Sequence, residues 1–344
     1  MEARYWHRRR ARITAIAIAA TIVLLLFRIA DLISPNPYHA YHDTRDLHSD
    51  TELYVDQVPL TEKLVEKHAL MPPSSKDAGD DKDGTADIAP KANETPVLQQ
   101  PATNYSKTIV MGKVSSEDTD WVATELPDWD RAIYVVDLPS NATSPTGLRT
   151  KLNKAREANP YLTFIIENYD NLPDIAVFLH AHRNGWPAAW HNDANGHDAV
   201  VMLKELQLAT VEKRGYVNLR CIHDPGCPRE LDMNPPGPAN QVEDAYPHVY
   251  AEMFNMTVDA VREQVPEVGS PCCAQFAVTR AEILKRPKSD YEWILAVLER
   301  SELEDYVLGR VMEYTWHILF GRDAVYCEDH RICWREVYGR PSFW

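Results

Sequence analysis

Three histidines that lie close together in the sequence form the pattern with the clearest chemistry. His180-Ala-His182 follows an apolar run, residues 175–179, and His191 comes shortly afterwards. A His-x-His at the end of a strand puts both imidazoles on one side of the extended chain. Together with His191 they predict a site for a divalent transition metal, or contacts to a sugar or phosphate. The alternative is that these histidines only make hydrogen bonds within a turn.

Two carboxylates, Asp118 and Asp120, follow another apolar run and directly precede Trp121. A pair of carboxylates at this spacing could hold a metal ion against a diphosphate. Asp-x-Asp is also a common start of a helix, because early carboxylates suit the positive helix end. We favour the helix start when position alone is considered.

A third candidate is Glu313, which lies in the largely apolar segment RVMEYTWHILFG, residues 310–321. On a single helix four residues of this segment share one face: Glu313, Trp316, His317 and Phe320. An unpaired carboxylate on a buried face is costly. Either Arg310 or His317 therefore neutralises Glu313, which we favour, or Glu313 faces a pocket as a base or a ligand.

The six cysteines form an even number, which indicates disulfides in an oxidising compartment. Two pairs, each six residues apart, suit small local loops: Cys221 with Cys227, and Cys327 with Cys333. The adjacent Cys272 and Cys273 are then left over, free or bridged to more distant partners. Zinc ligation with His223 and His330 is the alternative, but the sequence contains no Cys-x-x-Cys pair.

Strands and helices alternate in the segments that must position these side chains. Residues 108–114 (TIVMGKV), 131–138 (RAIYVVDL) and 175–179 (IAVFL) are typical of buried strands. An acidic helix follows the first strand, and Asn159-Pro160 predicts the N-terminus of a second helix. This order predicts an α/β fold with a mainly parallel sheet flanked by helices, with ligands beyond the carboxyl ends of the strands.

The N-terminus carries a pattern that is typical of membrane insertion. Five arginines in residues 1–12 precede an uncharged apolar run, residues 13–27, which further apolar residues extend to Ile33. Positive charge before an apolar segment stays cytoplasmic, which predicts a transmembrane signal anchor over 13–33 and a type II topology. A cleaved signal peptide is the alternative, because the run is short, although no small-x-small cleavage site follows Phe27.

The remaining chain divides into a stem and a body. Residues 34–106 are polar and contain prolines, which predicts a disordered luminal stem, and residues 107–340 are long enough for one luminal domain. A short span suits the thin membrane of the endoplasmic reticulum or Golgi. The formal net charge of -15 argues against a nucleic-acid partner. Four N-glycosylation sequons agree with a luminal body: Asn93, Asn104, Asn141 and Asn255.

Several separated blocks of the body resemble a fungal family known only as a domain of unknown function. The blocks are NKAREANPYLTFIIENYDNLPDIAVFLHAH (residues 153–182), CCAQFAVTR (272–280) and EYTWHILFG (313–321). The resemblance covers residues 108–321 and rests on their order, including F-L-H-x-H and E-x-x-W-H-x-x-F-G. It implies membership of this family and brings no activity with it.

The same order of blocks is distantly similar to glycosyltransferases of the GT-A type. These enzymes have an α/β sheet and often an Asp-x-Asp after a central strand, which binds a metal and the donor diphosphate. Here that strand ends in His180-Ala-His182, a departure that puts manganese dependence in doubt. The similarity implies that Asp118, Asp120 and Trp121 border the donor base.

In this reading His180 and His182 contact the donor diphosphate, His182 is required for transfer, and Glu313 is the acceptor-side base. Three tryptophans are candidates for a platform under the sugar: Trp186, Trp190 and Trp316. The expected function is sugar transfer from a nucleotide donor, with or without a divalent metal, to a glycan or lipid. The alternatives are a non-catalytic luminal scaffold with a degenerate transferase fold and a metal enzyme that uses His180, His182 and His191.

Overall fold

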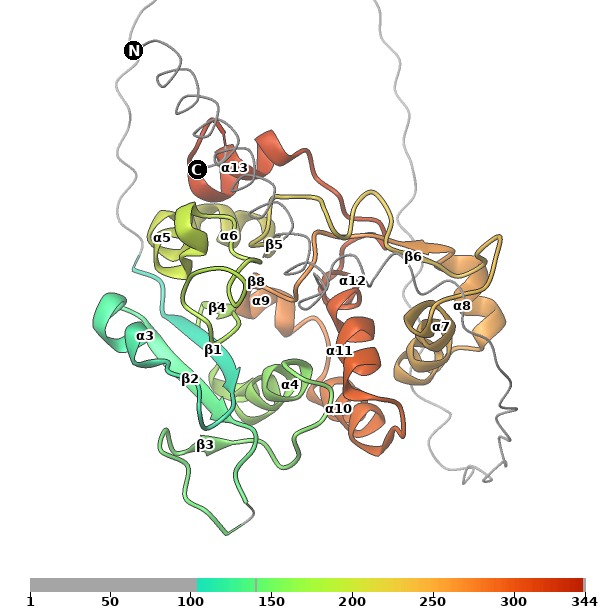
Figure 1. Cartoon of the computed structure of the whole chain (residues 1–344), viewed down its shortest axis with the longest axis horizontal. Helices are drawn as coiled ribbons and strands as arrows, with labels where there is room; N and C mark the ends of the chain where they lie inside the picture. The colour runs from blue at the N-terminus through green and yellow to red at the C-terminus, as the bar shows by residue number, and fades with distance from the viewer. Residues whose placement is uncertain (1–103, 140, 343–344) are drawn as a thin grey trace, which may run out of the picture. The chain divides into compact units, whose positions relative to one another are not determined.

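A six-stranded, mainly parallel sheet organises the part of the chain that the computed structural model describes, residues 104–139 and 141–342 (Figure 1). The strand order is β3-β2-β1-β4-β8-β5, and β8 runs in the direction opposite to the other five strands of this sheet. The strands are β1 (Lys107–Lys113), β2 (Asp130–Val135), β3 (Leu148–Arg149), β4 (Ile175–Phe178), β5 (Tyr216–Asn218) and β8 (Phe276–Thr279). A separate two-stranded sheet pairs β6 (Leu231–Asp232) with β7 (Glu267–Val268). The predicted mixed α/β fold with a mainly parallel sheet is confirmed.

The sheet is buried on both faces, as a mainly parallel sheet requires. Successive side chains of a strand point to opposite faces, and β1 shows this directly. Val110 belongs to the hydrophobic cluster on one face, whereas Ile109 and Met111 belong to the cluster on the other. The three strands predicted from apolar runs are the central strands of this sheet.

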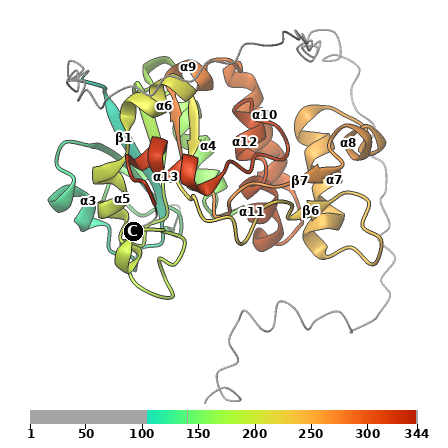
Figure 2. The same cartoon turned by 90° about the horizontal axis from the view of Figure 1, so that it is seen from above.

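Helices cover the two faces in separate layers (Figure 2). One face carries α4 (Ala158–Glu167), α9 (Arg280–Ile283), α10 (Lys288–Arg300), α11 (Asp305–Glu313) and α12 (Trp316–Leu319), with α7 (Gln241–Phe254) and α8 (Val258–Gln264) packed outside them. The other face carries α3 (Asp120–Glu125), α5 (Ala199–Glu205), α6 (Leu208–Arg214) and α13 (His330–Tyr338). Short 3-10 turns lie at Tyr169–Asn171 and Asn195–His197.

Two predicted helices differ in detail from the observed ones. α4 begins at Ala158, so Asn159 lies inside the helix, where it is buried and its amide donates to Glu299. The predicted single helix around Glu313 is wrong, because α11 ends at that residue and α12 begins at Trp316. The Thr315 hydroxyl between them donates to the Val311 carbonyl at 2.7 Å. Such bonds compete with the backbone pattern of a helix.

The predicted basic tail (1–12) and signal anchor (13–33) lie outside the described residues, as does the predicted stem (34–106) except for its last three residues. The helices within the described range include none that is both long and apolar enough to cross a membrane. The described chain begins in an ordered contact, since Ser106 donates to the Asp174 carboxylate through both its backbone N–H and its hydroxyl. Asn104, Asn141 and Asn255 are exposed, and Asn93 lies outside the described residues.

Candidate functional site at the carboxyl edge of the sheet

The carboxyl ends of β1, β2, β4 and β5 meet at one edge of the sheet, because these strands run in the same direction. β1 pairs with β2 on one side and with β4 on the other. The chain therefore leaves the neighbouring ends of β1 and β4 in opposite directions. α/β proteins bind ligands at such a switch in strand order.

The loops after β1 and β4 contact each other at this point. The Nε2 atom of His182 lies 3.3 Å from Oε1 of Glu117, and the other oxygen of Glu117 accepts the Val114 N–H at 2.7 Å. Trp121 adds a second link, because its indole N–H donates to the Ala181 carbonyl. His182 remains 42% exposed, so a ligand can reach it. Glu117 was not predicted, because a lone carboxylate in a loop carries no pattern.

The carboxylates of the Asp-x-Asp pair begin a helix, as the favoured interpretation predicts. Asp120 is the first residue of α3, and Oδ1 of Asp118 accepts the Asp120 N–H at 2.8 Å. Both aspartates are exposed, whereas Trp121 is only 7% exposed and packs in the core. Trp121 thus fixes the loop after β4 and leaves little ring surface for a ligand.

The predicted group of three histidines is divided by the structure. His180 and His191 lie against each other with ring centroids 4.3 Å apart, whereas His182 turns to Glu117. Among the described residues, the three imidazoles do not bring their ligand nitrogens within 4.8 Å of one another. The backbone N–H of His180 donates to the side-chain oxygen of Gln275, the residue that precedes β8.

His180 and His191 are neutral at pH 7. Burial lowers the pKa of His180 to about 4, and burial with the nearby His180 lowers the pKa of His191 to about 2. The Nε2 atoms of both rings are buried and have no hydrogen-bond partner in the protein. Two neutral nitrogens without partners remain available to a ligand or a metal at this edge.

A buried ion pair that was not predicted lies beside the histidines. Nη1 of Arg220 is 3.3 Å from Oδ1 of Asp193, and the two side chains are 5% and 0% exposed. The other Asp193 oxygen accepts the backbone N–H groups of Cys221 and Ile222, which holds the loop after β5. The Arg220 guanidinium also lies over the Trp190 ring, 4.8 Å from its centroid. This places a fixed positive charge and an aromatic face side by side.

Glu313 is neutralised by Arg310, one of the two partners expected for it. Nη1 of Arg310 contacts both Glu313 oxygens at 3.0 and 3.1 Å, and Nη2 donates to Glu230 at 2.7 Å. The backbone N–H of Cys273 donates to Oε1 of Glu313 at 2.7 Å. Burial raises the pKa of Glu313, and Arg310 and the Cys273 N–H oppose this rise. His317 instead contacts the Ala324 carbonyl.

The disulfides differ from the predicted local loops. Cys221 pairs with Cys333, Cys227 pairs with Cys327, and Cys272 pairs with its own neighbour Cys273. The first two bridges span sequence separations of 112 and 100 residues. The predicted pairs Cys221–Cys227 and Cys327–Cys333 are wrong because the fold brings α13 beside the loop after β5, which no sequence spacing reveals.

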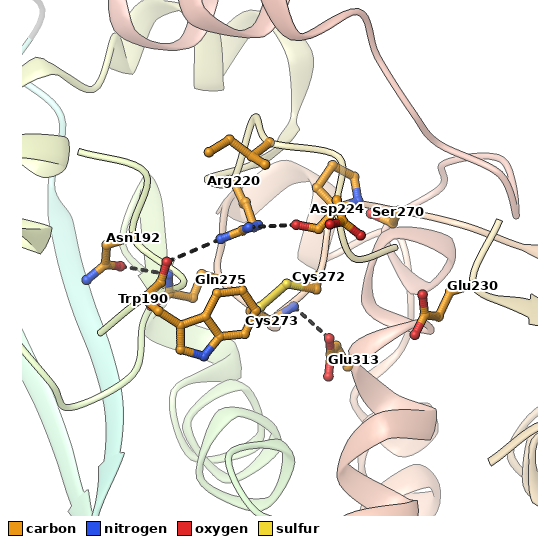
Figure 3. Close-up of a disulfide and its surroundings, with 12 residues drawn as sticks. Trp190, Asn192, Arg220, Asp224, Glu230, Ser270, Cys272, Cys273, Gln275 and Glu313 are labelled. Atoms are coloured by element: carbon orange, nitrogen blue, oxygen red, sulfur yellow. Dashed lines mark hydrogen bonds between the residues drawn. A yellow bond between two sulfur atoms is a disulfide. The ribbon is translucent and has the colours of Figure 1, made fainter. Parts of the chain in front are cut away.

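The bridge between adjacent cysteines lies at the same edge, next to Glu313 and near Trp190 (Figure 3). It precedes β8, the strand whose start lies beside the end of β4. Cys273 and Ala274 both have positive φ values, 88° and 50°. Non-glycine residues in this region are costly and occur where the surroundings force them, often at functional sites.

The tryptophans proposed as a sugar platform have different exposures. Trp316 is 1% exposed and stacks on Phe320 in the core, so it offers no platform. Trp190 is partly buried beside Arg220. Trp186 is 64% exposed in the segment between β4 and α5.

The sequence profile of one protein family matches residues 109–336, which is more than half of the chain. Its description is a protein of unknown function, DUF3431. No protein with a curated description and no solved structure matches the chain.

Proposed function

Because the chain belongs to DUF3431, a family of unknown function, its activity has to be inferred from the site, and we propose a glycosyltransferase-like enzyme. In this proposal it moves a sugar from a nucleotide donor to a glycan or lipid, as a type II membrane protein of the Golgi or endoplasmic reticulum. The likeness to GT-A-type enzymes and the fungal origin are parts of the same proposal. They rest on the sequence blocks described above.

The contact between His182 and Glu117 carries the proposal. It joins the carboxyl ends of β1 and β4 where the strand order switches, which is the place where parallel sheets receive nucleotides. Both side chains are partly exposed, so they can contact a bound donor. We assign His182 to the donor diphosphate. Asp118 and Asp120 border the donor on the α3 side.

Sugar transfer needs a stabilised leaving diphosphate and a base for the acceptor hydroxyl. Arg220 supplies a fixed positive charge near the histidines, and the Trp190 ring beside it supports stacking on a sugar. Glu313 is the proposed base, because burial raises its pKa toward the neutral range in which a base works best. Arg310 and the Cys273 N–H hold the Glu313 carboxylate in place.

A His-ligated metal enzyme is the second candidate. The observation that favours it is the pair His180 and His191, whose buried Nε2 atoms have no partner. His182 is the third predicted ligand, and it faces Glu117 in this structure. A tightly bound transition metal in the purified protein would favour this candidate over sugar transfer.

The first test is a thermal-shift screen of the purified full-length protein against nucleotide sugars, with and without manganese. A ligand at about 100 times its dissociation constant adds roughly 2.7 kcal/mol of stability. A shift with one class of donor supports the transferase and names its donor. If no donor shifts a folded protein, the chain is better explained as a scaffold with a degenerate transferase fold.

The second test replaces His182 by alanine and measures transfer with the donor found in the screen. We expect turnover to fall by about 100-fold or more, because loss of a group that acts in the transition state has effects of this size. His248→Ala is the matched control, since His248 is exposed on α7, away from the carboxyl edge. Full turnover in a folded His182→Ala protein contradicts the proposed role.

A further inference from the structure

Cys272, Cys273 and Glu313 form a cluster that the proposed transfer reaction uses only in part. Their two sulfur atoms and a carboxylate oxygen of Glu313 all lie within 4.8 Å of one another. The side chains are almost fully buried, because Cys272 and Cys273 are 1% and 8% exposed and the Glu313 side chain is 9% exposed. Among the described residues, this is the group of three His, Cys, Asp or Glu side chains that lies closely enough to hold one ion.

We propose that this cluster is a redox-gated site for a soft divalent cation such as Zn²⁺. Thiolates and carboxylates are ligands that Zn²⁺ prefers, and two thiolates strongly favour a soft ion over Mg²⁺ or Ca²⁺. In the disulfide form the two sulfurs share a bond and the site is closed. In the reduced form both sulfurs become available beside Glu313. The proposal does not require that the protein transfers sugars, although the cluster shares Glu313 with the proposed transfer reaction.

Opening the site is a thiol–disulfide exchange with an external dithiol. One thiolate of the dithiol attacks a sulfur of the Cys272–Cys273 bond, and that bond breaks through a mixed disulfide. The second thiol then resolves the intermediate, so the dithiol leaves as a disulfide and both cysteines carry protons. Binding of Zn²⁺ releases these two protons to solvent and forms two metal–sulfur bonds.

The surrounding backbone keeps the cluster together when the sulfur–sulfur bond opens. Before the pair, the Asn218 side chain donates to the Pro271 carbonyl at 2.8 Å. After it, Gln275 accepts the His180 N–H. At its centre the Cys273 N–H donates to Glu313. These contacts use no sulfur atom, so the two thiols stay close to the carboxylate.

The charges around the cluster also suit a divalent ion. Two thiolates and the Glu313 carboxylate carry three negative charges, of which the metal offsets two. Arg310, which Glu313 shares with Glu230, offsets part of the remaining one. Oε2 of Glu313 accepts only Arg310 among the described contacts, so it keeps a lone pair for the metal. His180 lies on the adjoining loop, and its buried Nε2 has no hydrogen-bond partner in the protein.

The test uses the full-length protein, reduced with a phosphine, freed of reductant without oxygen and titrated with Cd²⁺ as a thiolate-sensitive probe. We expect the reduced protein to bind Cd²⁺ with an ultraviolet thiolate-to-metal absorption band that the oxidised protein lacks. Cys272→Ser with Cys273→Ser should lose this band. The matched double variant, Cys227→Ser with Cys327→Ser, also lacks one bridge and should keep it. Glu313→Gln should keep the band and bind on the order of 10-fold more weakly.

A measurement on the wild-type protein covers the case in which a variant fails to fold. Thiol alkylation of the reduced protein, mapped by mass spectrometry, should be slowed by Cd²⁺ at Cys272 and Cys273 and unchanged at Cys227 and Cys327. Equal alkylation of Cys272 and Cys273 with and without Cd²⁺ overturns the proposal. Equal Cd²⁺ binding by the oxidised protein overturns it as well.

Discussion

Three imidazoles with lowered pKa values, those of His180, His191 and His317, are the groups through which pH acts most directly on this fold. Burial lowers the pKa of His317 to about 4, as it does for His180. The His317 ring contacts the Ala324 carbonyl through Nε2. Its other ring nitrogen, Nδ1, is buried without a partner. The effect of a buried imidazole on the free energy of unfolding can therefore be measured by replacing His317.

We expect His317→Gln to make the protein less sensitive to acid. The folded pKa of His317, about 4, lies below the reference value of 6.5, so the native state binds fewer protons between these values. Stability is then lost as pH falls through this window, by as much as about 3 kcal/mol for the whole shift. Glutamine can still donate to the Ala324 carbonyl but does not titrate. The measurement is the free energy of unfolding of both proteins from pH 7 to pH 4.

The difference between the pH profiles of the two proteins separates the effect of His317 from that of carboxyl groups whose protonation changes stability in the opposite direction. Burial raises the pKa values of Glu157, Glu230 and Glu313, so these carboxyls favour the folded state as pH falls. They are present in both proteins and cancel in the comparison. Identical pH profiles for wild type and His317→Gln would show that this imidazole does not titrate differently on folding.

At the scale of elements, the central strands could be predicted because each is a short apolar run that needs no partner to be recognised. β1, β2 and β4 are such runs. β5 and β8 were not predicted; β8 pairs with β4 on one side and with β5 on the other. That pairing joins residues far apart in sequence, which local patterns do not show.

The residues of the candidate site, like the strands, could be predicted only where a local sequence pattern marks them. His180 and His182 were found because they follow a recognisable strand, and Arg310 because it lies one helical turn from Glu313. Glu117, Arg220 and the Cys272–Cys273 bridge were missed. Each depends on a contact that only the tertiary fold makes. Glu117 contacts His182, Arg220 contacts Asp193, and the bridge contacts Glu313.

The long bridges tie separate elements together, and their removal should be costly. Cys221–Cys333 joins the loop after β5 to α13 across 112 residues of chain. Cys227–Cys327 lies inside this span and already closes 100 of the 112 residues, so the outer bridge closes an effective loop of 112 − 100 = 12 residues. A loop of this size corresponds to about 3 kcal/mol in the chain-entropy description. We therefore expect Cys221→Ala with Cys333→Ala to lower the free energy of unfolding by about 3 kcal/mol, measured by denaturant titration.

The bridge between neighbouring residues provides the control for this prediction. Cys272–Cys273 has a sequence separation of 1, so it closes almost no loop and restricts the unfolded chain very little. Replacing both of these cysteines by alanine should cost much less than removing Cys221–Cys333. If removal of Cys272–Cys273 lowered the free energy of unfolding more than removal of Cys221–Cys333, the long bridge would not act by restricting the unfolded chain.

At the scale of the whole molecule, the prediction of a luminal body depends on sequence features on both sides of the predicted anchor. The arginines before residue 13 set the direction of insertion. The sequons lie on the other side of the predicted anchor. Asn255 follows the last residue of α7. Asn141 and Asn255 are both exposed, so the enzyme that attaches N-linked glycans can reach them. Glycosylation and orientation are therefore one testable prediction.

We expect the full-length chain, expressed in eukaryotic cells with an N-terminal tag, to carry N-linked glycans on the same polypeptide as the tag. Only a signal anchor that stays uncleaved places the tag in the cytoplasm and the sequons in the lumen. Glycosidase treatment should increase gel mobility, and replacing the sequon asparagines by glutamine should remove that shift. A glycosylated chain that has lost its tag indicates a cleaved signal peptide instead. A tagged chain without glycans contradicts the prediction that the body is luminal. It would also contradict sugar transfer to acceptors in the Golgi or endoplasmic reticulum, because the body would not lie in that compartment.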